Sequence, residues 1–408
     1  MEMKPGKQTE VGDIPDDWII TRIGDIATVK DGTHQTPRYV PVGIPFYSVE
    51  HVTSGNFDDT KFITVDEHKF LTRSFRMERG DVLMTRIGSI GDCKLIDWDV
   101  DASFYVSLAL LKIHGASPVY FEQYSKTHSF KREVELHSLA SAIPRKINLG
   151  PISDVKIVLP PPAEQSAIAT ALSDVDTLLS SLDALISKKR DIKQAAMQQL
   201  LTGKARLPGF EEGWTVKRLD QLASIRSGGT PSTTVSRFWD GGIPWCTPTD
   251  ITRLGGGKYL LDTSRQITPE GLSNSSAELI PANSVVMTSR ATIGECAINL
   301  KPVTTNQGFK NFVPFEDTDV SFLYYLLQTQ RQGFIQLCSG STFLEIGKTQ
   351  LAAYKVHLPS TKVEQTAIAE VLSDMDAELA ALEARRDKTR LLKQGMMQEL
   401  LTGKTRLV

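Results

Sequence analysis

The stretch Glu164-Gln-Ser-Ala-Ile-Ala-Thr-Ala-Leu-Ser-Asp-Val-Asp176 returns, 200 positions later, as Glu364-Gln-Thr-Ala-Ile-Ala-Glu-Val-Leu-Ser-Asp-Met-Asp376. The likeness continues to Leu200-Leu-Thr-Gly-Lys and Leu400-Leu-Thr-Gly-Lys. About 25 of the 44 positions in 164–207 match 364–407 without a gap. We conclude that this segment was duplicated within the chain.

The sequence ahead of each copy repeats more faintly. Trp18 corresponds to Trp214, Gly43-Ile-Pro-Phe to Gly242-Ile-Pro-Trp, and Val82-Leu-Met-Thr to Val285-Val-Met-Thr. We therefore divide the chain into two variable domains, 1–160 and 208–360, and two constant helices, 161–207 and 361–408. Because the helices are preserved while the domains have diverged, we infer that the two halves share one function and bind two different targets.

Both constant segments are predicted to be long helices. The lead-ins Leu159-Pro-Pro-Pro and Leu358-Pro favour extended backbone ahead of a helix start. Gly203 and Gly403 suit the left-handed position that closes a helix. The pattern between them is about 39 residues long, roughly 58 Å of continuous helix.

Apolar residues in these helices recur at a spacing of three and four, as in a coiled-coil seam. The positions are Ile168, Leu172, Val175, Leu179, Leu182 and Ile186, then Ile368, Leu372, Met375, Leu379 and Leu382. The alternative is one apolar face packed on the helix's own domain. Because the constancy extends over the whole helix while the domains differ, we favour two helices that pack on each other.

Polar residues interrupt this seam: Lys189 and Lys193 in the first copy, and Arg386, Thr389 and Lys393 in the second. Such residues can fix register and orientation at a cost in stability. In an antiparallel pair the bases approach Asp374 and Asp376, or Asp174 and Asp176. We take Lys193 and Asp374 as the pair to test by charge reversal.

Composition sets bounds on the class of protein. The net charge is −2 and no segment has a marked basic excess, whereas a protein that grips DNA unaided usually has one. No apolar run reaches the roughly 20 residues that span a bilayer, and Met1-Glu-Met-Lys-Pro-Gly-Lys lacks a signal-peptide core. We expect no membrane association and a cytoplasmic protein with four free, buried cysteines.

The sequence matches none of the catalytic motifs that we compared with it. The only Pro-Pro run, Pro160-Pro-Pro-Ala163, does not match the Asn/Asp-Pro-Pro-aromatic motif of DNA amino-methyltransferases. Thr202-Gly-Lys and Thr402-Gly-Lys lack the rest of a phosphate-binding loop and follow helices instead of opening them. The histidines have no metal-site spacing. We expect neither a catalytic residue nor a metal site.

The variable domains have a mixed α+β pattern. Strand-like runs such as Ile19-Ile-Thr-Arg-Ile, Asp81-Val-Leu-Met-Thr, Val285-Val-Met-Thr and Lys310-Asn-Phe-Val alternate with glycine-rich turns. Helical stretches are predicted around 119–138 and 320–337.

The loops of these domains carry side chains that suit DNA base edges, since arginine can pair with guanine and asparagine or glutamine with adenine. Each such residue is more often an ordinary surface or turn residue. The candidates are Thr33, His34, Gln35, Arg38, Arg86, Ser89, Arg145 and Lys146 in the first domain, and Thr230, Ser232, Thr233, Arg237, Ser289, Arg290, Thr292, Asn306 and Gln307 in the second.

Over almost its full length the chain resembles the specificity subunit of type I restriction–modification systems. The resemblance rests on the paired Pro-Pro-x-x-Glu-Gln-x-x-Ile-Ala and Leu-Leu-Thr-Gly-Lys segments and on the domain starts at Trp18 and Trp214. The second lead-in departs from the pattern at Ser360, and Asn306-Gln-Gly has no clear counterpart near Ser103-Phe-Tyr.

This resemblance implies two target recognition domains, each reading one half of a split, asymmetric double-stranded DNA site. They would be joined by two long antiparallel coiled-coil helices with pseudo-twofold symmetry. Two methylation subunits and the motor-nuclease restriction subunits would attach to this scaffold. The methylation subunits would bind S-adenosylmethionine, and this chain itself would need no cofactor. Partners that close around DNA would account for the near-neutral charge.

Two other readings stay open. One is a stand-alone DNA-binding adaptor or decoy without methylation partners. The other is a coiled-coil scaffold that binds no DNA. Stable assembly with a methyltransferase would separate a specificity subunit from the stand-alone adaptor. Sequence-selective DNA binding in the presence of that partner would separate it from the scaffold that binds no DNA.

Overall fold

The computed structural model describes residues 7–9, 12–139, 142–338 and 344–407, so the opening residues 1–6 examined for a signal peptide lie outside it. The chain forms two compact units, Met1–Asp183 with Arg385–Val408, and Ala184–Ala384. Each unit combines one variable domain with the start of the helix that follows it and the end of the other helix. The units therefore cut across the four segments drawn from the sequence.

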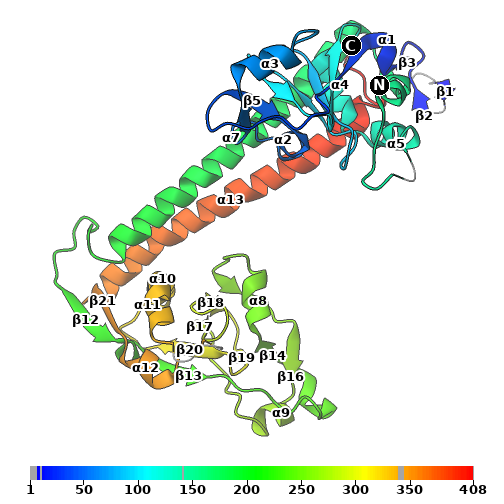
Figure 1. The fold of residues 1–408 in the computed structure, drawn as a ribbon. Coiled ribbons are helices and arrows are strands. Elements are labelled where there is room, and N and C mark those ends of the chain that lie inside the picture. Colours follow the sequence, from blue (N-terminus) through cyan, green and yellow to red (C-terminus); the bar gives the residue numbers. More distant parts are fainter. Residues whose placement is uncertain (1–6, 10–11, 140–141, 339–343, 408) are drawn as a thin grey trace. The chain divides into compact units, whose positions relative to one another are not determined.

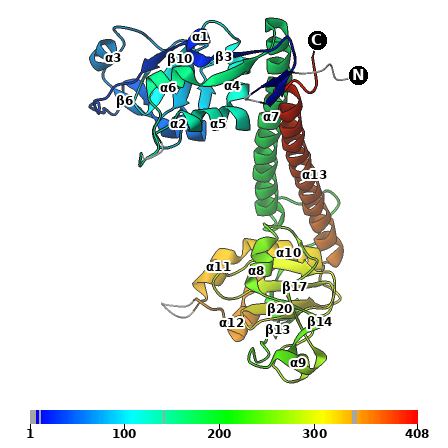
Figure 2. The same ribbon diagram turned by 90° about the vertical axis from the view of Figure 1, so that its right-hand side faces the viewer.

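The two long helices are α7 (Pro162–Leu200) and α13 (Lys362–Leu400), each 39 residues long as expected. Both end ahead of a glycine in the left-handed region, Gly203 and Gly403, each with φ of 72°. Within each unit a segment of α7 lies beside a segment of α13, as both views of the ribbon show (Figure 1, Figure 2). No helix in the described ranges is both long and apolar enough to cross a membrane.

The predicted seam residues differ in burial. The ends of the seam are buried in the domain cores, where Ile168 and Leu172 join the first core, and Ile368 and Leu372 the second. Towards the middle of the helices the remaining seam residues range from buried to half-buried: Val175, Leu179, Leu182, Ile186, Met375, Leu379 and Leu382. One apolar stripe thus serves both of the packing roles that the sequence left as alternatives.

Ion pairs between α7 and α13 show that the helices are antiparallel. In the first unit Lys393 pairs with Asp176, while Arg390, earlier in α13, pairs with Asp183, later in α7. The second unit has the same arrangement, with Lys193 paired to Asp376.

Of the two aspartates expected near Lys193, the structure pairs it with Asp376, so the choice of Asp374 for charge reversal was wrong. Asp376 follows Leu372 by four positions and shares its helical face, whereas Asp374 follows by two and is exposed on another face. Asp376 also accepts a hydrogen bond from the Tyr325 hydroxyl at 2.6 Å, and Asp176 accepts one from the Gln123 amide at 3.0 Å. Each aspartate therefore joins its variable domain to both helices.

The first domain is built on a four-stranded antiparallel sheet with the order β4-β10-β7-β8. Its strands are β4 (Ala27–Asp31), β10 (Leu108–Ile113), β7 (Val82–Thr85) and β8 (Cys93–Leu95). A second sheet has the order β6-β5-β9, with β6 (Lys61–Ile63), β5 (Ile44–Tyr47) and β9 (Ser103–Phe104). The other elements are β1 (Lys7–Thr9), β2 (Gly12–Ile14), β3 (Ile19–Arg22), β11 (Lys156–Leu159), α1 (Ile23–Ile26), α2 (Val49–Ser54), α3 (Val65–Leu71), α4 (Pro118–Ser125), α5 (His128–Leu136) and α6 (Leu149–Asp154).

The second domain repeats this plan with the sheets β13-β20-β17-β18-β15 and β16-β14-β19. The first has β13 (Ala223–Ser227), β20 (Phe309–Pro314), β17 (Ser284–Thr288), β18 (Cys296–Asn299) and β15 (Tyr259–Leu260). The second has β16 (Arg265–Ile267), β14 (Trp239–Cys246) and β19 (Thr304–Thr305). The other elements are β12 (Trp214–Arg218), β21 (Lys355–Pro359), α8 (Pro248–Arg253), α9 (Pro269–Ser273), α10 (Val320–Thr329), α11 (Arg331–Gln336), α12 (Lys348–Ala353) and short 3₁₀ turns at Leu219–Gln221 and Ser236–Phe238.

The predicted strands are confirmed, and each predicted domain helix proves to be two. The stretch 119–138 breaks into α4 and α5 because Thr127 caps the second helix, its hydroxyl accepting from the Phe130 amide. The stretch 320–337 breaks at Gln330 between α10 and α11. The fold class is the predicted one, mixed α+β domains with two long antiparallel helices.

A buried glutamate holds each domain to the helix ends. Glu364 is 1% exposed, and it accepts hydrogen bonds from the Trp214 indole at 3.2 Å and from Arg206 at 2.7 and 2.9 Å. In the first unit Glu164 is held in the same way by Trp18 and Arg406. The glutamate of the Glu-Gln motif in one long helix therefore binds the arginine of the Thr-Gly-Lys-x-Arg motif that follows the other helix.

Candidate nucleic-acid interface

In the first domain the candidate residues come from three segments that meet at one end of the main sheet. The Thr33 loop follows β4, the Arg86 loop follows β7, and Lys146 forms a bridge with Ile87. The Gly88 amide donates to the Arg145 carbonyl at 2.8 Å. These two contacts join residues that are 59 and 57 positions apart in the chain.

Arg86 links these segments from inside the domain. Its side chain is 5% exposed, and it donates to Asp31 at 2.6 Å and to the Ile147 carbonyl at 3.2 Å. Asp31 also contacts the His34 ring at 2.8 Å. With its guanidinium engaged inside the domain, Arg86 joins the three segments from within.

The second domain brings together the equivalent segments. Thr230 hydrogen-bonds Gln307, and the Ser289 amide donates to the Gly308 carbonyl at 2.7 Å. Arg290 pairs with Glu345 at 3.0 Å. The candidate loops after β13, β17 and β19 thus lie side by side.

The register of the sheets shows which residue of the first domain is equivalent to Asn306 of the second. β9 runs parallel to β5 as β19 runs parallel to β14, so Phe104 corresponds to Thr305 and Tyr105 to Asn306. A glycine in the first loop of each domain packs against this equivalent backbone. A Cβ on Gly32 would lie 2.5 Å from the Tyr105 carbonyl, and one on Gly228 would lie 2.0 Å from the Asn306 carbonyl. In both domains the first loop requires glycine because it packs directly on this backbone.

Both domains bury a cation at this end of the sheet, but Arg86 of the first domain lies in the loop after β7, whereas Lys310 of the second lies in strand β20. Asp31 lies opposite Ala109 in the first domain, and Ser227 lies opposite Lys310 in the second. Lys310 is 5% exposed, with its ammonium 3.5 Å from the Ser289 hydroxyl and 4.0 Å from Glu345. Burial lowers the pKa of Lys310, and the charge of Glu345 opposes that effect. In the register of the two sheets Arg86 corresponds to Ser289 and Ala109 to Lys310, so the two buried cations stand at positions that do not correspond.

The candidates divide by exposure and by partner. Arg86 and Ser289 are buried, and Thr292 is half-buried. Arg145, Arg237 and Arg290 are exposed but form ion pairs with Glu135, Glu270 and Glu345. The exposed candidates further include Gln35, Arg38, Ser89, Ser232, Thr233 and Gln307, whereas Thr33, Lys146, Thr230 and Asn306 are half-buried.

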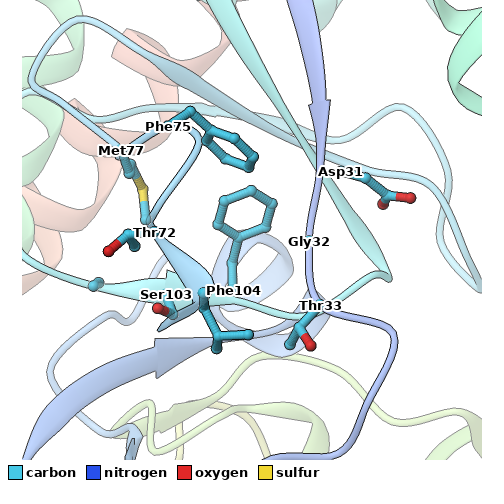
Figure 3. A pocket seen from close by; sticks show the side chains of 10 residues that line it. Asp31, Gly32, Thr33, Thr72, Phe75, Met77, Ser103 and Phe104 are labelled. Atoms are coloured by element: carbon cyan, nitrogen blue, oxygen red, sulfur yellow. The ribbon is translucent and has the colours of Figure 1, made fainter. Parts of the chain in front are cut away.

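A cavity of about 100 Å³ lies beneath the first loop. The rings of Phe75 and Phe104 lie 6.2 Å apart on one wall, and Asp31 and Thr33 line another (Figure 3). Such a space holds several water molecules. The loop therefore has a partly polar space on its inner side.

Comparison with known proteins shows the family. A family model described as the type I restriction modification DNA specificity domain matches residues 15–189 and 211–391. This chain belongs to the family of type I restriction–modification specificity subunits. Two copies of the domain are matched, in agreement with the internal repeat.

Individual relatives carry the same description. The putative type I restriction enzyme MjaX specificity subunit of Methanocaldococcus jannaschii is 25% identical over 421 residues, covering 98% of this chain and 96% of that one. The MjaIX specificity subunit of the same organism is 36% identical over 165 residues, covering 40% of this chain and 38% of its own length. The EcoR124I/EcoR124II specificity subunit of Escherichia coli is 30% identical over 242 residues, 55% of this chain and 56% of that one.

A solved structure shares the fold. The S subunit of a type I restriction–modification system from M. genitalium aligns with a TM-score of 0.60 at 15% identity, covering 97% of this chain and 99% of that one. The mixed domains and long helices described above are therefore the fold of known S subunits.

Proposed function

We propose that this chain recognises a bipartite, asymmetric DNA site, with the domain 1–160 reading one half-site and the domain 208–360 reading the other. The observation that carries the proposal is the loop arrangement at the end of each main sheet. The same three segments converge in both domains, while the exposed side chains differ. Gln35 and Arg38 in the first domain give way to Ser232, Thr233 and Gln307 in the second.

Different polar side chains on one backbone frame suit different base edges. The frame is held from inside by Arg86 in one domain and by Lys310 in the other, so the exposed residues can vary without loss of the fold. Such a division supports recognition of two unlike sequences by one duplicated scaffold.

The long helices are proposed to hold two methylation subunits, and restriction subunits would join that complex. Helix α7 exposes Leu178, Leu185 and Ile192, which are 39%, 39% and 43% exposed and seven positions apart. Helix α13 exposes Leu391 and Leu392. Apolar residues at heptad spacing outside the α7–α13 seam support packing against a partner helix.

The chemistry of methyl transfer would then belong to the partner, with its S-adenosylmethionine. The sequence of this chain lacks the amino-methyltransferase motif, and the polar groups of the candidate interface are held by one another in a supporting frame. We propose that the chain contributes position and sequence choice, and no catalytic residue.

The test is co-expression with the methylation subunit of the same host, followed by purification and single-molecule mapping of modified adenines. The expected result is a stable complex and one methylated motif with two specified halves and an unspecified spacer of fixed length. Sequence-selective DNA binding by this chain without assembly would support the adaptor reading. Assembly without any sequence preference would support the scaffold reading, and either result would reject the proposal.

A further inference from the structure

One cation in each domain rests on aromatic rings beside the first candidate loop. In the second domain the Arg265 guanidinium lies 3.7 Å from the centre of the Trp239 ring and 5.2 Å from that of Trp245. The two indoles pack edge to face at 4.9 Å. Stacking of this kind holds a guanidinium in place through cation–π attraction while its N–H groups remain available.

The first domain has the same feature at the same register. Lys61 lies opposite Phe46 in the β5–β6 pair, as Arg265 lies opposite Trp245 in the β14–β16 pair. The Lys61 ammonium lies 4.9 Å from the centre of the Tyr39 ring. Tyr39 packs edge to face on Phe46 at 6.0 Å. The feature has therefore persisted while the surrounding loops diverged.

Neither cation forms an ion pair within the part of the protein that the structure describes. Lys61 and Arg265 are exposed, and no carboxylate of the described residues lies within ion-pair distance of either. Arg237 and Arg290 in the neighbouring loops are paired with glutamates. Charge that is ordered, exposed and unpaired is suited to an anionic ligand.

The aromatic rings also hold the candidate loop in place. The Trp245 indole donates to the Gly229 carbonyl at 3.0 Å, and the Trp239 indole donates to the Ser232 carbonyl at 3.1 Å. In the first domain Tyr39 directly follows Arg38 in the chain. Each cation therefore lies next to the residues proposed to meet base edges.

We propose that Lys61 and Arg265 bind phosphate oxygens of the DNA backbone, one at each half-site. This inference rests on the proposed function. Base-reading residues must differ between two unlike half-sites, but the sugar–phosphate backbone is common to both. A cation kept at one register position in both domains matches the common feature. Arginine offers a phosphate a forked pair of donors, and lysine offers a point charge.

The experiment uses the full chain in complex with its methylation partner. DNA binding is measured by fluorescence anisotropy on three duplexes: the mapped site, that site with one base changed in the second half, and an unrelated sequence. Arg265→Gln is expected to weaken binding by on the order of tenfold at low salt and by a similar factor on all three duplexes. The slope of log affinity against log salt should become shallower by about 1.

A second measurement separates phosphate from base. Neutral methylphosphonate groups replace the phosphates of the mapped site one at a time. The wild-type complex should lose affinity at one position near the second half-site, and Arg265→Gln should be insensitive there. Lys61→Gln should behave in the same way at the first half-site. A loss confined to the mapped site would assign Arg265 to a base and overturn the proposal, as would unchanged affinity.

Matched controls come from the edge strands of the two domains. Arg22 lies opposite Lys156 and pairs with Asp154, and Arg218 lies opposite Lys355 and pairs with Asp220. Arg22→Gln and Arg218→Gln remove the same charge and should leave affinity and salt slope unchanged. Trp239→Phe keeps the charge of Arg265, and a partial loss of affinity is expected from it. If the wild-type complex itself fails to discriminate the mapped site, the proposed function fails, whereas normal discrimination with an inert Arg265 rejects only this inference.

Discussion

The Lys393 ammonium lies 2.6 Å from the Asp176 carboxylate, joining the end of α13 to the first half of α7. The side chain of Lys393 is 14% exposed, so the pair is screened from solvent more than a surface pair is. Lys193 and Asp376 make the equivalent contact in the second unit. In each unit a lysine thus occupies a seam position that an apolar residue would otherwise fill, and its ion pair across the two helices favours one register.

The first prediction concerns this pairing. Lys193→Glu should destabilise the second unit, and Asp376→Lys in the same chain should restore part of the loss. We expect a coupling energy of about 1 kcal/mol, because both side chains are partly exposed. Urea unfolding of the four variants of the cycle measures it. Asp374→Lys is the control, since Asp374 is exposed on another face. Equal rescue by Asp374→Lys would contradict the assignment of the pair.

The second prediction follows from the environment of Asp176. Burial by itself raises the pKa of Asp176, but hydrogen bonds from Lys393 and Gln123 and nearby positive charge outweigh it, so the pKa lies below its usual value of 3.8. A depressed carboxylate pKa stabilises the folded state above the unfolded pKa, and this stabilisation is lost as the pH falls through the folded value. The stability difference between wild type and Asp176→Asn should therefore be constant from pH 5 to 7 and shrink below about pH 4. Denaturant unfolding across this range measures the difference, and a gap that widened in acid would have the wrong sign.

The third prediction concerns the buried glutamates. Arg206→Ala leaves Glu364 buried with the Trp214 indole as its remaining side-chain donor among the described residues, and should cost about 3 kcal/mol. Hydrogen–deuterium exchange should rise at residues 196–207 and 362–372. Arg406→Ala should produce the equivalent loss around Glu164. The exposed Lys204 lies in the same turn as Arg206, so Lys204→Ala serves as the control and should change stability by less than about 0.5 kcal/mol. Protection that survives Arg206→Ala would show that the contact is dispensable.

The fourth prediction treats the helices as a ruler. Inserting four residues, about one helical turn, into the middle of both α7 and α13 should lengthen the unread spacer and leave both half-sites unchanged. Mapping of methylated adenines reads spacer and half-sites together. An insertion in one helix alone puts the ion pairs out of register, so it should lower stability without giving a defined longer spacer. An unchanged spacer in the double insertion would reject the ruler.

The fifth prediction separates the two domains. Arg38 is exposed in the first candidate loop, and Arg38→Ala should relax recognition at one position of the first half-site by about 1–3 kcal/mol. The second half-site should be unaffected. Mapping of the methylated sites measures both. Arg22→Ala in the same domain is the charge control, and a change in the second half-site would contradict separate reading.

Much of the scaffold could be predicted from local sequence. The prolines before Glu164 and Glu364, the glycines at 203 and 403 and the spacing of three and four between them determine two helices of equal length. Each of these effects acts within a few residues, through backbone sterics or helical periodicity. For the same reason the strands of the domains were recognisable, whereas the break at Thr127 was harder to see within a helical composition.

The tertiary structure decided which residues meet and which are exposed. Lys193 pairs with Asp376 instead of Asp374, because the rotation of α13 and the Tyr325 hydroxyl bring that carboxylate to the seam. Arg86 is buried on Asp31, although as a loop arginine it resembled a base-reading residue. The sequence does not distinguish Lys61 and Arg265 from other basic residues, because the aromatic rings they contact come from distant positions in the chain. A side chain's partners and exposure depend on segments far apart in the chain, and only the packed fold brings those segments together.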